Sequence, residues 1–214
     1  IMIPKSFDES IRSKIRTCLW GYKENVPVII FTPFDVIFYQ IGKGCKKFEG
    51  WWKSYLLNND CLIVLTPQGS QVIDAISCVE ENTDIVFIGL AGSLGKLKVG
   101  DIVEPITAFY NDSESKRTAR QEPSFKKTSI VTVGSFAESF EKSELLQKKA
   151  ECVDMETGII FQTSFFQGKT ARSIQIISDD FSKKSFFDTN LKTMEAQIGV
   201  VSDFVRKMIS KNTL

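Results

Sequence analysis

The chain contains no histidine among its 214 residues. This absence excludes Ser-His-Asp and Cys-His catalytic arrangements, as well as zinc sites with mixed cysteine and histidine ligands. General acid and base chemistry must therefore come from carboxylates, lysines, tyrosines or water. The five cysteines stand singly, without a C-x-x-C pair, and their number is odd. They predict free thiols in a reducing compartment rather than a disulfide framework or a metal site.

A strong charge imbalance and a long apolar run are also lacking. Twenty-seven basic residues stand against 26 acidic ones, so there is no global field to attract nucleic acid or an anionic membrane. The charged run 113–127 is the one candidate patch, but it mixes both signs and is interpreted as a solvated loop. No run reaches the roughly 20 apolar residues that span a bilayer, and residues 1–14 lack a secretory-signal pattern. We therefore expect a cytoplasmic protein that binds neither nucleic acid nor membrane.

Short apolar, β-branched runs alternate with amphipathic helical stretches along most of the chain. This pattern predicts a single α/β domain with a central, twisted, mostly parallel (mixed) sheet and helices on both faces. Residues 26–214 are predicted to form this domain, and residues 1–25 a helical extension in which Ser6–Glu9 resembles a capping box. The predicted strands are 26–31, 61–65, 84–88, 101–103, 129–133 and 173–177; the predicted helices are 70–80, 141–150, 155–166 and 191–211.

Three segments carry unusual residues at expected strand or helix ends. A glycine-rich turn, Gly89-Leu-Ala-Gly-Ser-Leu-Gly95, follows an apolar strand and leads into Leu-Lys-Val-Gly-Asp-Ile-Val. Glycine permits tight turns and the close approach of a ligand to the backbone. The other two are Val153-Asp-Met-Glu-Thr157 and Ile177-Ser-Asp-Asp180. Taken alone, each has an ordinary structural interpretation: a turn, an acid at a helix N-terminus, and a polar strand end.

Taken together, the three segments resemble the signatures of the purine nucleoside phosphorylase and nucleosidase superfamily. The matching patterns are G-x-A-G-x-L with L-K-V-G-D-I-V, V-E-M-E-A, and I-S-D. The resemblance extends from Val26 to the carboxyl terminus and is nearest to the branch of methylthioadenosine/S-adenosylhomocysteine nucleosidases. It implies a nucleoside phosphorylase-like fold and cleavage of the N-glycosidic bond of a purine nucleoside or derivative. It also implies a homo-oligomer that acts on a small molecule without a metal or cofactor.

The resemblance also implies roles for individual residues. Met155 would pack against the ribose, and Glu156 would bind its hydroxyl groups. Asp179 would donate a proton to N7 of the purine. Ser178 stands directly before it, and the charge of Asp180 would raise its pKa.

For further positions the resemblance implies a role less directly. Leu90, Ala91 and Gly92 stand where the glycine segment of the family borders the substrate. Asp35 stands where nucleosidases have an acid that activates water, although the usual glycine is missing and the usual acid is Glu; an ordinary loop carboxylate is the alternative. Phe136, or Phe140, stands where an aromatic ring stacks on the base, and a core phenylalanine is the alternative.

Phosphorolysis and hydrolysis differ in the nucleophile, and phosphate needs cationic or N–H donors to hold it. The phosphorylases have an Arg two residues before the first glycine and a Ser directly after it, where this chain has Phe87 and Leu90. Hydrolysis is therefore favoured, and Leu90 would line the pocket. A phosphorylase that uses phosphate as co-substrate stays open if a neighbouring subunit supplies a cation such as Arg12 or Lys43. A degenerate relative that binds a nucleoside without cleaving it is the third possibility.

Overall fold

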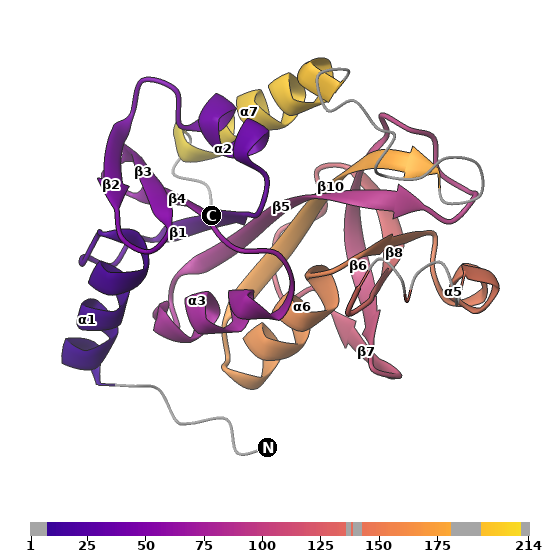
Figure 1. Cartoon of the computed structure of the whole chain (residues 1–214), viewed down its shortest axis with the longest axis horizontal. Coiled ribbons are helices and arrows are strands. Elements are labelled where there is room, and N and C mark those ends of the chain that lie inside the picture. Colours follow the sequence, from indigo (N-terminus) through magenta and orange to yellow (C-terminus); the bar gives the residue numbers. More distant parts are fainter. Residues whose placement is uncertain (1–7, 136–137, 139–142, 181–193, 211–214) are drawn as a thin grey trace.

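A ten-stranded mixed sheet forms the centre of the molecule in the computed structural model, which describes residues 8–135, 138, 143–180 and 194–210 (Figure 1). The strands are β1 (Val28–Thr32), β2 (Lys46–Glu49), β3 (Lys53–Asn58), β4 (Cys61–Leu65), β5 (Asp84–Ser93), β6 (Ile102–Tyr110), β7 (Ser113–Lys116), β8 (Lys126–Thr132), β9 (Cys152–Asp154) and β10 (Thr170–Asp180). The helices are α1 (Glu9–Trp20), α2 (Asp35–Ile41), α3 (Val72–Cys78), α5 (Ser143–Lys149), α6 (Thr157–Phe166) and α7 (Glu195–Ser210), and η1 (Gly69–Gln71) is a single 3₁₀ turn.

The sheet has two parts. Strands β10, β6, β8, β9 and β5 follow one another, and β5 pairs again with β10, so these five strands close on themselves; we call them the barrel. Strands β1, β4, β3 and β2 continue outward from β5 as an open sheet, which we call the wing. Figure 1 shows the wing on the left and the barrel on the right. The central strands β4, β1, β5 and β10 run parallel, as predicted.

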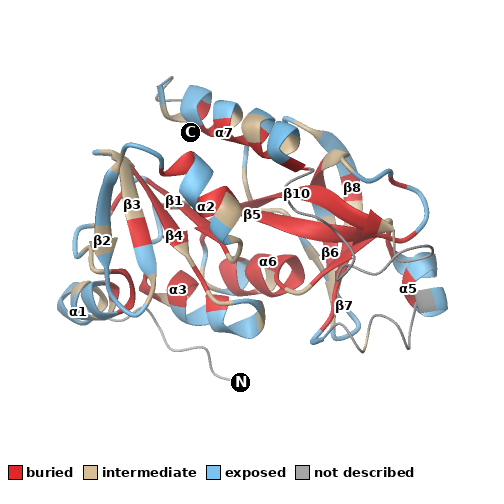
Figure 2. Cartoon of the chain, turned by 45° about the horizontal axis from the view of Figure 1, so that its top comes forward, coloured by how far each residue is buried: buried red, intermediate tan, exposed pale blue. Residues whose placement is uncertain are grey.

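Helices cover both faces of the central strands, because those strands are apolar on both faces. Residues of α1, α3 and α6 pack against one face, and residues of α2 and α7 pack against the other. Side chains of β5 alternate between the two clusters: Phe87 faces α3 and α6, whereas Ile88 faces α2 and α7. Figure 2 shows the buried strands between helices whose outer faces are exposed. The predicted α/β class is confirmed.

Two local predictions need correction at the start of the chain and at the glycine segment. Helix α1 is capped by Asp8, whose Oδ1 accepts from the Ser10 N–H at 2.8 Å, and Ser6 lies outside the described residues. Trp20 of this helix is fully buried in the core. The boundary between the extension and the domain at residue 25 stays a prediction. The predicted glycine turn is instead strand: β5 continues to Ser93, because β10 pairs with it along its whole length.

The charged run 113–127 is also not a solvated loop. Its first residues form β7, which pairs with β6, and the side chain of Arg117 is buried. Arg117 Nε donates to Glu104 Oε1 at 2.9 Å, and Arg172 Nη2 donates to Glu104 Oε2 at 2.6 Å. The Ser124 N–H also donates to Glu104 Oε2. A buried acid thus fastens this run to the barrel. Among the described helices, none has the length and apolar character needed to cross a membrane.

Candidate active site

The three segments singled out in the sequence meet on adjoining strands of the barrel. Gly92 of β5 pairs on one side with Asp179 of β10 and on the other with Val153 of β9. On that second edge, β5 is paired with β1 as far as Phe87 and with β9 from Gly92 onward. The neighbour of β5 therefore changes between these two residues. Carboxyl ends of strands where neighbours change are the usual ligand sites of α/β sheets.

Asp179 lies at a bulge in β10. The pairing with β5 shifts between Ile177 and Asp179, so Ser178 is the extra residue, and such bulges re-aim side chains next to functional sites. The Ser178 hydroxyl lies 2.6 Å from Asp179 Oδ1, to which it donates, and 3.3 Å from the Ala91 carbonyl oxygen. Asp179 is 3% exposed, and its Oδ2 atom is buried with no hydrogen-bond partner among the described residues.

Burial raises the pKa of Asp179, and the nearby charge of Asp180 raises it further, while the Ser178 hydrogen bond acts in the opposite direction. The side chain is consequently suited to carry a proton toward neutral pH. Its unpartnered oxygen is available to give that proton to a ligand atom.

Glu156 is the second buried acid. It stands between β9 and α6, is 4% exposed, and its Oε1 accepts from the Gly69 N–H at 2.7 Å. Burial raises the pKa of Glu156 to about 8, the charge of Asp154 adds to the rise, and backbone N–H groups of Gly69 and Met155 oppose it. A carboxyl group in this state can both donate to and accept from the hydroxyl groups of a sugar.

Gly69 is a contact that the sequence reasoning missed. It lies in η1, where the chain leaves β4 and turns toward α3, and its φ of +76° is one that glycine adopts without strain. A Cβ at this position would lie 4.0 Å from Met155 Cε. The same glycine therefore borders Met155 and binds Glu156. A Pro-Gln-Gly sequence that begins two residues after the end of a predicted strand was the available signal.

The remaining residues of the glycine segment are placed within the sheet. Leu90 is 6% exposed and belongs to the apolar cluster that α2 and α7 cover, so its side chain lies in the core. Ala91 belongs to the cluster on the α3 and α6 face. Phe87 is fully buried on that same face. The role of Leu90 and Ala91 in lining a substrate pocket stays a prediction.

Asp35 is less well placed than the other acids. It is the first residue of α2, is exposed, and its Oδ1 accepts from the Val36 N–H at 2.7 Å. The contacts of the described residues do not join it to Glu156 or Asp179, so its assignment as a catalytic base stays a prediction. Phe136, like Phe140, lies outside the described residues.

A buried group of polar side chains lies beside Glu156, and it was not predicted from the sequence. We call it the Asp154 cluster; its members are Thr132, Asp154, Thr157, Ser173 and Gln175. Each is at most 6% exposed. The group joins β8, β9, β10 and α6 through hydrogen bonds between side chains, and its only charged member is Asp154. Burial raises the pKa of Asp154, against the hydrogen bonds from Thr132 and Thr157.

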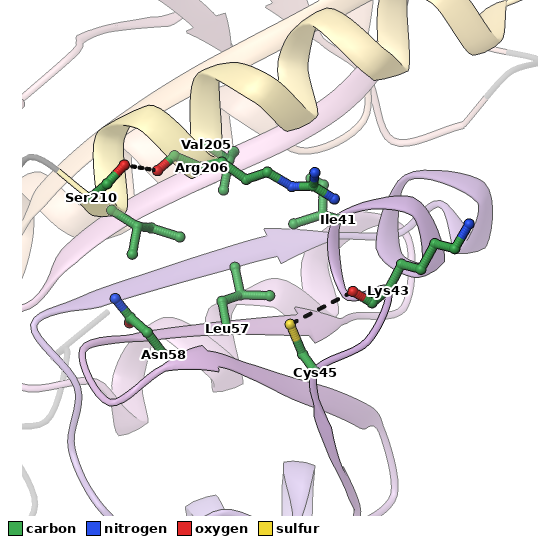
Figure 3. A pocket seen from close by; sticks show the side chains of 9 residues that line it. Ile41, Lys43, Cys45, Leu57, Asn58, Val205, Arg206 and Ser210 are labelled. Carbon is green, nitrogen blue, oxygen red and sulfur yellow. Dashed lines mark hydrogen bonds between the residues drawn. The ribbon is translucent and has the colours of Figure 1, made fainter.

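A pocket of about 480 Å³ lies elsewhere, between the ends of α2 and α7 and strand β3 (Figure 3). Asn58, which lines it, pairs with Cys61, the first residue of β4, so the pocket is at the amino edge of the parallel strands. Asp179 lies at the carboxyl edge. Lys43 also lines this pocket, and its side chain points away from Leu57 in Figure 3. A phosphate contact from Lys43 would therefore have to reach the barrel of another subunit.

No protein-family model matches the chain, and no curated protein matches it in sequence. Solved structures do match its fold, and among them are nucleosidases of the nucleoside phosphorylase superfamily. The chain thus has the nucleoside phosphorylase-like fold.

Three of these structures show how far the similarity extends. The 5′-methylthioadenosine/S-adenosylhomocysteine nucleosidase of Campylobacter jejuni has a TM-score of 0.69 at 15% identity, covering 87% of this chain and 100% of that one. The AMP nucleosidase of Bacteroides thetaiotaomicron gives 0.66 at 15% identity, covering 92% and 97%. The futalosine hydrolase of Helicobacter pylori gives 0.62 at 17% identity, covering 88% and 99%.

Proposed function

We propose that the chain is a nucleosidase, an enzyme that hydrolyses the N-glycosidic bond of a purine nucleoside or derivative. The observation that supports this proposal is the register that joins Asp179, Gly92 and Val153 across three strands. One strand separates the buried acid, whose Oδ2 has no hydrogen-bond partner among the described residues, from the strand that leads to Met155 and Glu156. The shared fold with solved nucleosidases supports it.

The chemistry follows from the charges that the reaction creates. When the C1′–N9 bond breaks, its electron pair leaves with the purine, and positive charge develops on the ribose ring. Asp179 would donate its proton to N7, which converts the departing base into a neutral molecule. Glu156 would hold the ribose hydroxyls, and Met155 would pack against the sugar.

A water molecule would then add to C1′ and lose a proton, which gives free ribose. We assign Asp35 as the base that aligns this water, on the strength of the family resemblance and of its place after β1. Replacing Asp35 with Asn would then slow turnover while leaving the affinity for the nucleoside nearly unchanged. A normal rate in that variant would assign the water to another group.

Hydrolysis is proposed over phosphorolysis because the positions that correspond to two phosphate ligands are apolar and buried. Phe87 is fully buried and Leu90 is 6% exposed, and neither can bind a dianion. A phosphorylase remains the second candidate only if a subunit in a homo-oligomer contributes a cation. We also expect the protein to be cytoplasmic.

The test is the release of free base from a panel of nucleosides, with and without phosphate. The panel includes adenosine, inosine, and the compounds in the names of the matching structures: 5′-methylthioadenosine, S-adenosylhomocysteine, AMP and futalosine. Base released without phosphate supports a nucleosidase, and release that requires phosphate supports a phosphorylase. Binding without release would show a degenerate relative.

A further inference from the structure

Both carboxylate oxygens of Asp154 accept hydrogen bonds from other parts of the chain. Its Oδ1 accepts from the Thr132 hydroxyl at 2.6 Å, and its Oδ2 accepts from the Thr157 N–H at 2.8 Å, from the Thr157 hydroxyl, and from Gln175 Nε2 at 3.3 Å. These donors come from β8, α6 and β10. Neutral groups thus hold a buried carboxylate, and its position is fixed by three separate elements of the fold.

The bonds of Asp154 enclose the two residues that are proposed to hold the sugar. Asp154 precedes Met155 and Glu156, and its side chain binds Thr157, which follows them. Glu156 occupies the N-cap position of α6, yet its side chain makes no capping bond. Asp154 instead caps the helix at the Thr157 N–H. The carboxyl group of Glu156 is thereby left to bind Gly69 and a ligand.

Gln175 ties the glycine segment to the same cluster. Its side-chain amide lies against Gly89, where a Cβ would come within 2.7 Å of Gln175 Oε1 and 2.8 Å of Phe87 Cε1. Its Nε2 also lies 2.9 Å from the hydroxyl oxygens of Thr157 and Ser173. The first glycine of the segment therefore makes room for Gln175 rather than for a ligand. The cluster therefore contacts two of the three family-like segments, and Gln175 belongs to the strand that carries the third.

We infer that Asp154 is a positioning residue, which fixes the Met155-Glu156 turn so that the Glu156 carboxyl faces the ribose hydroxyls. This inference rests on the proposed function. Asp154 itself is buried and bonded within the protein, so it acts on the sugar through Glu156. A shift of about 1 Å in such a group can reduce turnover by on the order of 100-fold.

The test is a double-mutant cycle between Asp154→Asn and Glu156→Ala. In Asp154→Asn an amide NH₂ group replaces one carboxylate oxygen. This donor then faces a hydrogen-bond donor of Thr157 or Thr132, so the hydrogen bond between them is lost. We expect kcat/KM to fall by about 10- to 100-fold when Glu156 is present, and by less than about twofold when Glu156 is already Ala. Equal losses in both backgrounds would overturn the inference, because they would show a general structural role.

A second pair of variants keeps the test valid if Asp154→Asn does not fold. Thr157→Val removes one hydroxyl bond to Asp154 at nearly constant shape, and Thr157→Ser retains it. We expect the Val variant, and not the Ser variant, to lose activity in a Glu156-dependent manner. The double-mutant cycle is repeated with the dissociation constant of the nucleoside as its readout. If the wild type neither cleaves nor binds any nucleoside, both proposals fail; if it does either and the cycle is additive, only the positioning role fails.

Discussion

The barrel contains two kinds of buried acid. Glu104 has a fully buried side chain and lies between Arg117 and Arg172, whose side chains are 8% and 6% exposed. Asp179 and Glu156 are buried to a similar extent, but among the described residues no basic side chain contributes to the shift of their pKa values. The charge of Glu104 is neutralised by two guanidinium groups. Burial of Asp179 and Glu156 instead raises their pKa values.

This difference separates a structural acid from a functional one. A buried acid between arginines holds segments together, and losing it leaves cations without a partner. A buried acid without a cation is costly to keep, and groups with pKa values perturbed in this way concentrate at active sites. The comparison therefore predicts that Glu104 governs stability, whereas Asp179 and Glu156 govern turnover and pH dependence.

The largest expected effect is on turnover in Asp179→Asn. The amide cannot supply a proton to the purine, so we expect kcat to fall by about 10²- to 10⁴-fold while the melting temperature stays the same or rises. Base release under saturating nucleoside measures the rate. Asp203→Asn is the control, because it makes the same chemical change at an exposed position of α7 and should retain full activity. Comparable activity in both variants would remove Asp179 from the mechanism.

The next effect is on stability in Glu104→Gln. Two buried guanidinium groups would lose their counter-charge, and we expect the free energy of unfolding to fall by about 3–5 kcal/mol. Urea denaturation measures it. Glu114→Gln, at an exposed acid of the neighbouring strand β7, should change stability by less than about 0.5 kcal/mol. If the two variants were equally stable, Glu104 would not be the structural acid described above.

The smallest expected effect is on the pH dependence of stability. Because the pKa of Glu156 is raised from an ordinary 4.5 to about 8, the folded protein keeps a proton that the unfolded chain loses above pH 4.5. The free energy of unfolding should therefore fall as pH rises from 4.5 to 8, with Glu156 contributing on the order of 2–4 kcal/mol. Glu156→Gln should flatten this slope. Asp154 and Asp179, with pKa values shifted in the same direction, would leave a residual slope. An unchanged slope would mean that Glu156 is ionised in the folded protein.

The sequence predicted the buried parts of the fold better than its edges. Strand β4 matches the prediction over Cys61–Leu65, because a continuous apolar run has few other structures available. Strands β2 and β7 were missed, since these strands are mostly exposed and carry polar residues on both faces. Helix α2 was missed because its apolar residues continue those of β1.

Within the candidate site, the family resemblance indicated Glu156 and Asp179, and the fold puts Asp179 on β10 and Glu156 shortly after β9, with β5 between these two strands. The bulge at Ser178 and the contact between Gln175 and Gly89 could not be predicted, because both depend on pairing between residues 86 or more positions apart. The space at Gly89 was attributed to the approach of a ligand for the same reason, because its actual neighbour, Gln175, is remote in sequence.

The most direct measurement is the fate of labelled water during cleavage. Wild-type protein is incubated with a nucleoside that it cleaves, in H₂¹⁸O without phosphate. The masses of the products are then measured by mass spectrometry. We predict one ¹⁸O atom on each released ribose, one free purine per ribose, and a rate of product formation lower by about 100-fold or more with Asp179→Asn. Unlabelled sugar, a product formed only when phosphate is added, or full activity of Asp179→Asn would contradict this prediction.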